Sequence, residues 1–92
     1  MKISDKKRDK IAEQILALLF SSHKPMFTSH VAEEIARDEE FIKKILEDLK
    51  KRKLVIEIKK NPKGVEYIKR SRWRLSDSAY KIYKQHQANK FL

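Results

Sequence analysis

The amino-acid sequence predicts a small α+β domain that is mostly helical: three helices, one β-hairpin and a final helix. Three observations lead to this fold class. Apolar residues recur at helical spacing over much of residues 4–52. After Lys53 they alternate with polar residues, as in a strand. Residues 61–64 (Asn-Pro-Lys-Gly) then form a turn signal that contains the chain's single glycine. A chain of 92 residues suits one domain, which we expect to span residues 1–92.

The first helix is expected over residues 4–20. Its apolar side chains recur at positions i, i+4, i+7 and i+8, which lie on one helical face: Ile11, Ile15, Leu18 and Leu19. Ser4 offers a side-chain oxygen for the N-cap, and Asp5 places a negative charge in the first turn, where the helix dipole favours it. Residues 21–25 (Ser-Ser-His-Lys-Pro) then end the pattern.

Two further helices are expected before Lys53. Thr28 is a suitable N-cap for a short second helix, whose buried face would comprise Val31, Ala32, Ile35 and Ala36. The connection Arg37-Asp38 contains no glycine, and Asp38 is expected to cap the third helix over residues 39–52. The apolar stripe of that helix would comprise Phe41, Ile42, Ile45, Leu46 and Leu49.

A hairpin over residues 54–75 and a helix over residues 77–89 complete the expected fold. In the first strand Leu54, Ile56 and Ile58 alternate with Val55, Glu57 and Lys59. The second strand, residues 65–75, places Val65, Tyr67, Trp73 and Leu75 on one face and Arg70, Arg72 and Arg74 on the other. Its apolar face favours core packing for Trp73 over stacking on a nucleic-acid base. Ser76 is expected to cap the last helix, with Ala79, Ile82, Tyr83 and His86 on one face.

Three local patterns carry a resemblance to a known family. Residues 28–49 form a helix-turn-helix; Leu49 is followed by Lys50-Lys51-Arg52-Lys53-Leu54-Val55; and a strand ending in Leu75 leads through Ser76 into a helix with Tyr80. In this order the chain resembles the winged helix-turn-helix superfamily, in the manner of small prokaryotic regulators of the MarR and PadR kind. Lys53 and Ala79 stand where that family often has glycine. The resemblance implies that the third helix enters the DNA major groove and that the hairpin, or wing, reaches the backbone or minor groove.

Positive charge is concentrated in the wing. The chain has 23 Lys and Arg against 13 Asp and Glu, a net charge of +10. Counting along residues 50–74 gives eleven basic and two acidic residues, a local balance of +9. Such clustering suits phosphate binding, which releases condensed counterions, although a solvated outer face of a hairpin is often rich in lysine as well. The phosphate-binding candidates here are Lys59, Lys60, Lys63, Arg70, Arg72 and Arg74.

The helix-turn-helix offers further DNA-binding candidates together with a conflict. Lys43 and Lys44 are expected on the exposed face of the third helix, and Thr28, Ser29 and His30 at the start of the second helix can hydrogen-bond phosphate. Residues 38–49, however, carry five acids and two bases, a balance of −3. Carboxylates stabilise a helix N-terminus but repel phosphate if they face it. A carboxylate can also accept a hydrogen bond from cytosine.

Several functional classes have no support in the sequence. The chain has no cysteine and its three histidines are widely spaced, so we expect no disulfide and no metal site. We see no glycine-rich phosphate loop and no nucleophile–base pair, and therefore expect no enzyme activity, cofactor or small-molecule substrate. No apolar run is long enough to span a membrane and no signal peptide is evident, which favours a cytoplasmic, nucleoid-associated protein.

The sequence thus predicts a protein that binds double-stranded DNA and regulates transcription. Two alternatives stay open: a winged helix used for protein contacts within a transcription complex, and a sequence-neutral architectural protein that binds DNA or RNA. We also expect a homodimer built from the first and last helices. The first helix has more apolar residues than so small a core requires, and the last carries Tyr80, Ile82 and Tyr83.

Overall fold

The computed structural model describes residues 5–59 and 70–90. Within these ranges the elements are α1 (Asp5–Ser21), β1 (Met26–Phe27), α2 (Thr28–Ile35), α3 (Glu39–Lys51), β2 (Val55–Ile58), β3 (Arg72–Leu75) and α4 (Asp77–Lys90). This order confirms the expected α+β fold class, with β1 as an addition. The expected cap Ser4, the turn at residues 61–64 and the strand residues 65–69 lie outside the described residues.

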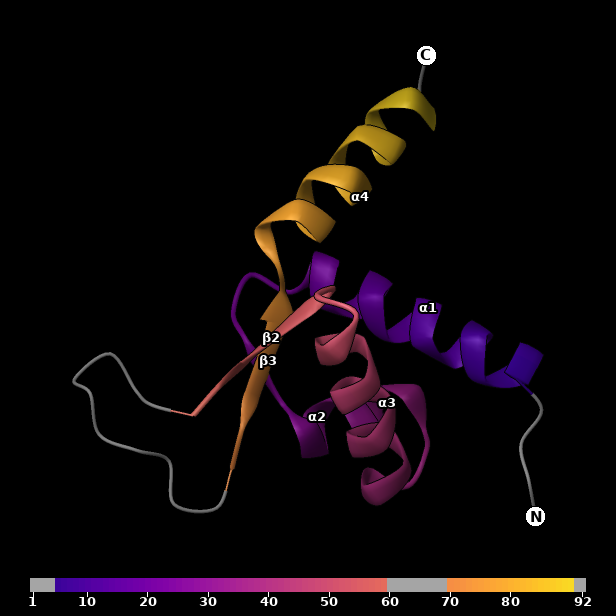
Figure 1. The fold of residues 1–92 in the computed structure, drawn as a ribbon, viewed down its shortest axis with the longest axis vertical. Coiled ribbons are helices and arrows are strands. Elements are labelled where there is room, and N and C mark those ends of the chain that lie inside the picture. Colours follow the sequence, from indigo (N-terminus) through magenta and orange to yellow (C-terminus); the bar gives the residue numbers. More distant parts are fainter. Residues whose placement is uncertain (1–4, 60–69, 91–92) are drawn as a thin grey trace.

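One apolar core joins the first three helices to the sheet (Figure 1). It contains Ile11, Ile15, Leu16 and Leu19 of α1, Val31 of α2, and Ile42, Ile45, Leu46 and Leu49 of α3. Val55 of β2 and Trp73 and Leu75 of β3 close it from the sheet side. Trp73 is fully buried, so the prediction that it packs in the core is confirmed. Burial of these side chains from water is the main force that holds the wing against the helices.

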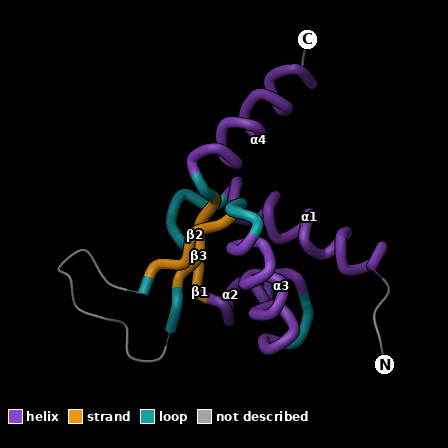
Figure 2. The backbone as a smooth tube through the Cα atoms, in the orientation of Figure 1, coloured by secondary structure: helices purple, strands orange, loops and turns teal. Residues whose placement is uncertain are grey.

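The sheet has three antiparallel strands in the order β1-β3-β2, which Figure 2 shows side by side. β1 was not expected, because two residues are too few to carry an alternating pattern. It pairs with β3 through Met26↔Trp73 and Phe27↔Arg72. On the other side of β3, Glu57 of β2 is paired with Trp73 and Ile58 with Arg72. β1 therefore ties the start of α2 to the strand that bears the arginines.

Helices α2 and α3 both end in a left-handed residue that is not glycine. Ala36 and Lys53 each have φ of 61°. The next amide donates back to the helix in each case: Arg37 N–H to the Ala32 carbonyl and Leu54 N–H to the Leu49 carbonyl, both at 3.0 Å. Such six-to-one bonds satisfy carbonyls at a helix end. The turn at Lys53 thus forms without the glycine usual in the family, at a steric cost of about 1–2 kcal/mol.

Three of the expected helix caps lie within the described residues: Asp38 and Ser76 are confirmed, and Thr28 is wrong. The Asp38 carboxylate accepts from Phe41 N–H at 3.3 Å, and the Ser76 hydroxyl accepts from Ala79 N–H at 3.2 Å. The residue that precedes α2 is Phe27, which makes no side-chain cap. Thr28 is already inside the helix, and its hydroxyl instead accepts a hydrogen bond from the buried Trp73 indole at 2.8 Å. A buried indole N–H needs an acceptor, and β1 brings Thr28 to it.

Helix α4 projects away from the body of the domain (Figure 1). Its first turns contact α1, where the Phe20 ring lies 5.2 Å from the Tyr80 ring and 5.6 Å from the Tyr83 ring between centroids. The expected inner face is only partly correct: Ala79 is buried, Tyr83 is half-buried, and Ile82 is 63% exposed. Because the helix leaves the body after its first turns, His86 is exposed as well. Among the described residues, no helix is long and apolar enough to cross a membrane.

Candidate nucleic-acid interface

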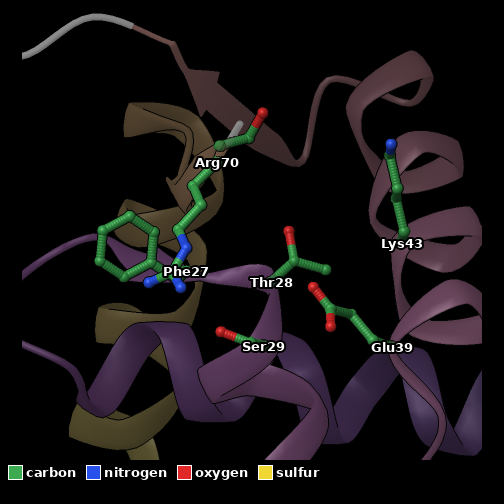
Figure 3. Close-up of a pocket in the computed structure, with 7 residues that line it drawn as sticks. Phe27, Thr28, Ser29, Glu39, Lys43 and Arg70 are labelled. Atoms are coloured by element: carbon green, nitrogen blue, oxygen red, sulfur yellow. The ribbon is translucent and has the colours of Figure 1, made fainter. Parts of the chain in front are cut away.

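A polar hollow of about 210 Å³ lies where α2, α3 and the base of the wing meet (Figure 3). Its lining comprises Phe27, Thr28, Ser29, Glu39, Lys43, Arg70 and Ser71. Four of these are predicted DNA-binding residues from three separate segments: Thr28, Ser29, Lys43 and Arg70. The fold therefore gathers cationic and hydroxyl groups from the helix-turn-helix and from the wing at one place. We call this feature the hollow.

Two arginines of the wing stack on a single phenylalanine beside the hollow. The guanidinium carbon of Arg70 lies 5.6 Å, and that of Arg72 5.1 Å, from the centroid of the Phe27 ring. The His30 ring approaches the same phenylalanine edge-on at 5.8 Å. Because Phe27 is the register partner of Arg72 in the sheet, the ring is fixed directly beside the arginines. Cation–π contacts of this kind restrain a guanidinium.

A charged cluster joins the end of α3 to β2. Lys50 Nζ lies 2.8 Å from Glu57 Oε1, the Ser71 hydroxyl donates to the second carboxylate oxygen, and Lys59 Nζ lies 4.0 Å from Oε1. Glu57 follows Val55 on the inward face, so only 9% of its side chain is exposed. Partial burial favours a raised pKa for Glu57, but the hydrogen bonds from Lys50 and Ser71 and the charges of Lys50 and Lys59 outweigh it and lower the pKa. The cluster thus fixes the orientation of the wing relative to α3.

The remaining predicted contacts are distributed around this centre. Lys44 is exposed on the outward face of α3 and does not line the hollow. His30 and Lys59 are exposed, whereas Ser29 and Arg72 are half-buried. Thr28 is only 9% exposed, and its hydroxyl accepts a hydrogen bond from the Trp73 indole. Lys60 and Lys63 lie outside the described residues.

Arg74, another of the phosphate-binding candidates, has partners at the start of α4. Its Nη1 donates to the Leu75 carbonyl at 2.9 Å and lies 3.4 Å from the Asp77 carboxylate at the start of α4. Arg74 lies near the end of β3 that leads into α4, whereas Arg70 precedes the start of that strand. The alternating pattern of the strand predicts the face on which Arg74 lies but not its contact with Asp77.

Sequence reasoning missed Phe27, Lys50 and Glu57. Phe27 precedes a helix and belongs to a strand too short to recognise. Glu57 carried a signal, because it follows Val55 at spacing i+2 and a carboxylate on an inward face requires a cationic partner. Which cation supplies that charge depends on how α3 packs on β2, and the sequence does not contain that information. Within residues 5–59 and 70–90, no three side chains of the metal-binding types gather in one place.

Comparison with known proteins identifies the fold. No protein-family model matches the sequence, and no curated protein matches it in sequence. Several solved structures match the fold. A mutant of Lactococcus lactis ZitR in apo form superposes with a TM-score of 0.68 at 19% identity, over 92% of this chain and 60% of that one. An S. aureus MepR–DNA complex superposes with a TM-score of 0.72 at 15% identity, over 90% of this chain and 66% of that one.

A third similar structure is the PcaV transcriptional regulator of Streptomyces coelicolor, in complex with its natural ligand. It gives a TM-score of 0.56 at 18% identity, over 88% of this chain and 51% of that one. All three are MarR-family winged-helix regulators. The chain spans between half and two thirds of their lengths. Its fold is the winged helix-turn-helix of that kind, as the sequence resemblance implied.

Proposed function

We propose that the protein binds double-stranded DNA and regulates transcription. The observation that carries this proposal is the hollow, where the N-terminal half of α3 meets Arg70, with Arg72 stacked on the same Phe27 ring beside it. In helix-turn-helix proteins the N-terminal residues of the recognition helix contact base edges. The fold is shared with a regulator solved in complex with DNA. We place the protein in the cytoplasm, in association with the nucleoid.

In the proposed complex, α3 enters the major groove and the wing follows the adjacent backbone. Lys43 and Lys44 then point to base edges, while Ser29 and His30 lie near phosphates at the start of α2. Arg70 and Arg72 bind phosphate from their fixed positions on Phe27, and Lys59, Lys60 and Lys63 extend the contact along the wing. Arg74 contributes little, because Leu75 and Asp77 already engage it.

We further propose a homodimer that uses α1 and α4. Phe20, Tyr80 and Tyr83 form an aromatic cluster where the two helices meet, and Ile82 is exposed beside it. Burying these groups against a second copy gives two recognition helices, which suit half-sites about one helical turn, roughly 34 Å, apart. Sedimentation at micromolar concentration is expected to give twice the monomer mass, reduced by Tyr83→Glu. A monomer mass throughout would exclude the dimer.

A salt titration of binding tests the main proposal. Affinity is measured on a duplex selected from random sequence, on random duplex and on a structured RNA. If about five phosphates are engaged, log affinity falls with log salt at a slope of roughly −4 to −5. Preference for the selected duplex supports a regulator. Equal binding to all three would indicate a sequence-neutral architectural protein, and no binding near physiological salt would indicate a protein-contact module.

Charge variants locate the interface. Arg70→Ala and Arg72→Ala are expected to weaken binding on every duplex and to make the salt slope shallower by about one each. Lys84→Ala, an equal charge change on the exposed part of α4, is the matched control and should change binding little. If all three variants behave alike, net charge rather than the wing drives binding.

A further inference from the structure

The exposed side chain of Glu39 lines the hollow. It lies in the first turn of α3 and is directed toward Thr28 and Ser29 (Figure 3). Within residues 5–59 and 70–90 it makes no hydrogen bond or ion pair. The N-terminus of α3 is already capped by Asp38. Glu39 is therefore not needed as a cap, and its neighbour Glu40 supplies the same charge to the helix dipole.

Glu39 is exposed, and it lies on the flank of α3 that borders the hollow. Glu39, Lys43 and Lys50 recur at i, i+4 and i+11, which is one flank of a helix. The contact between Lys50 and Glu57 shows that this flank faces the wing. Glu40 is rotated from Glu39 by about 100° about the helix axis and does not line the hollow. A carboxylate and an ammonium, one turn apart, thus stand side by side on the wing-facing flank.

We propose that Glu39 is a specificity-determining residue that accepts a hydrogen bond from the N4 amino group of a cytosine in the major groove. This inference rests on the proposed function. An ionised carboxylate only accepts hydrogen bonds, and cytosine presents a lone donor on its major-groove edge. Adenine also has an amino group, but its adjacent N7 acceptor repels a carboxylate. Lys43, one turn further along α3, donates to guanine O6 or N7 at a neighbouring position.

The same charge also disfavours non-specific binding. On a sequence without a donor at that position, the Glu39 carboxylate faces the phosphates with no compensating hydrogen bond. Such a group raises specificity by weakening the complex with wrong partners. The acidic first turn of α3 and the basic wing therefore have complementary tasks: the wing supplies affinity, and Glu39 restricts it to sites that present cytosine.

Glu39→Gln tests the proposal, with Glu34→Gln as the matched control, since Glu34 is an exposed carboxylate of α2 that does not line the hollow. Sites are selected from random duplex for the wild type and each variant, and affinities are measured on the wild-type site and on random duplex. Glu39→Gln should bind random duplex more tightly, by about threefold, and the wild-type site about tenfold more weakly. Because glutamine pairs with adenine N6 and N7, the selected site should change from cytosine to adenine at one position. Glu34→Gln should shift both affinities by the same factor and leave the selected site unchanged.

The outcomes separate this proposal from the function on which it rests. If the wild type selects a site and Glu39→Gln selects the same one, Glu39 acts through charge alone and this inference is wrong, while the proposed function stands. If the wild type binds no duplex or selects no site, both fail. Circular dichroism of each variant establishes that the helices remain folded.

Discussion

Trp73 Nε1 donates a hydrogen bond to Thr28 Oγ1 at 2.8 Å, across 45 positions of the chain. The bond joins β3 to the first residue of α2, with both side chains buried. It places the helix-turn-helix and the wing in one rigid unit, since Trp73 is also paired with Met26 and Glu57 in the sheet. The relative position of the two proposed DNA-binding elements depends on this contact.

Removing the Thr28 hydroxyl should destabilise the domain. Thr28→Val keeps the shape but leaves the buried indole N–H without an acceptor, so we expect the free energy of unfolding to fall by about 1–3 kcal/mol. Urea denaturation followed by far-UV circular dichroism measures this, since that signal does not depend on the single tryptophan. In a Trp73→Phe background the same change should cost almost nothing, because the donor is absent. An equal loss in both backgrounds would show that the hydrogen bond contributes no stability.

Glycine at position 53 should stabilise the protein. Lys53 has φ of 61°, a conformation that glycine adopts without a steric penalty. We expect Lys53→Gly to raise the free energy of unfolding by about 0.5–1 kcal/mol, after allowing for the greater freedom of glycine in the unfolded chain. Lys51→Gly is the matched control within α3 and should lower it by about 1 kcal/mol. A loss of stability on Lys53→Gly would contradict the left-handed turn.

The Glu57 cluster should stabilise the fold in a pH-dependent manner. The pKa of Glu57 is lowered in the folded protein from an ordinary value of 4.5. Its contribution is therefore fully present above the unfolded pKa and is lost as pH falls through the folded one. We expect Glu57→Gln to cost about 1 kcal/mol at pH 7, a modest value because Lys50 is 49% exposed and screened by water. The difference from wild type should become smaller as the pH falls below 4.5.

Unfolding of wild type and variant in urea at pH 3, 5 and 7 measures that difference. Glu34→Gln, which removes an exposed carboxylate of α2, serves as the control and should have a smaller effect at pH 7. A Glu57→Gln penalty that persists unchanged at pH 3 would assign the effect to packing rather than to charge.

Phe27 should position the arginines for DNA. Replacing its ring in Phe27→Leu removes the surface on which Arg70 and Arg72 stack, so both side chains must be ordered when phosphate binds. We expect affinity for every duplex to fall by at most about fivefold to thirtyfold, the equivalent of two exposed cation–π contacts. Phe27→Tyr keeps the ring and should bind like the wild type. Equal binding by all three proteins would show that the stacking has no role in recognition.

The main elements of the fold could be predicted from local sequence. The apolar stripe of α3, the caps at Asp38 and Ser76, and the burial of Trp73 all follow from short-range periodicity and side-chain chemistry, and all are confirmed. Lys53 was identified as standing in a glycine position, and it adopts the left-handed conformation. These features depend on residues a few positions apart, whose geometry the helix and strand periods specify.

The site depended on contacts between residues far apart in the chain. β1 is two residues long and exists because β3 offers it a free edge, yet it places Phe27 under the arginines and Thr28 against Trp73. Glu57 contacts Lys50 only because α3 packs on β2, and Arg74 forms an ion pair with Asp77 at the start of α4. Local patterns state which face a side chain occupies. Its partner on that face is set by how the helices and strands pack, because the burial of one shared core fixes their positions together.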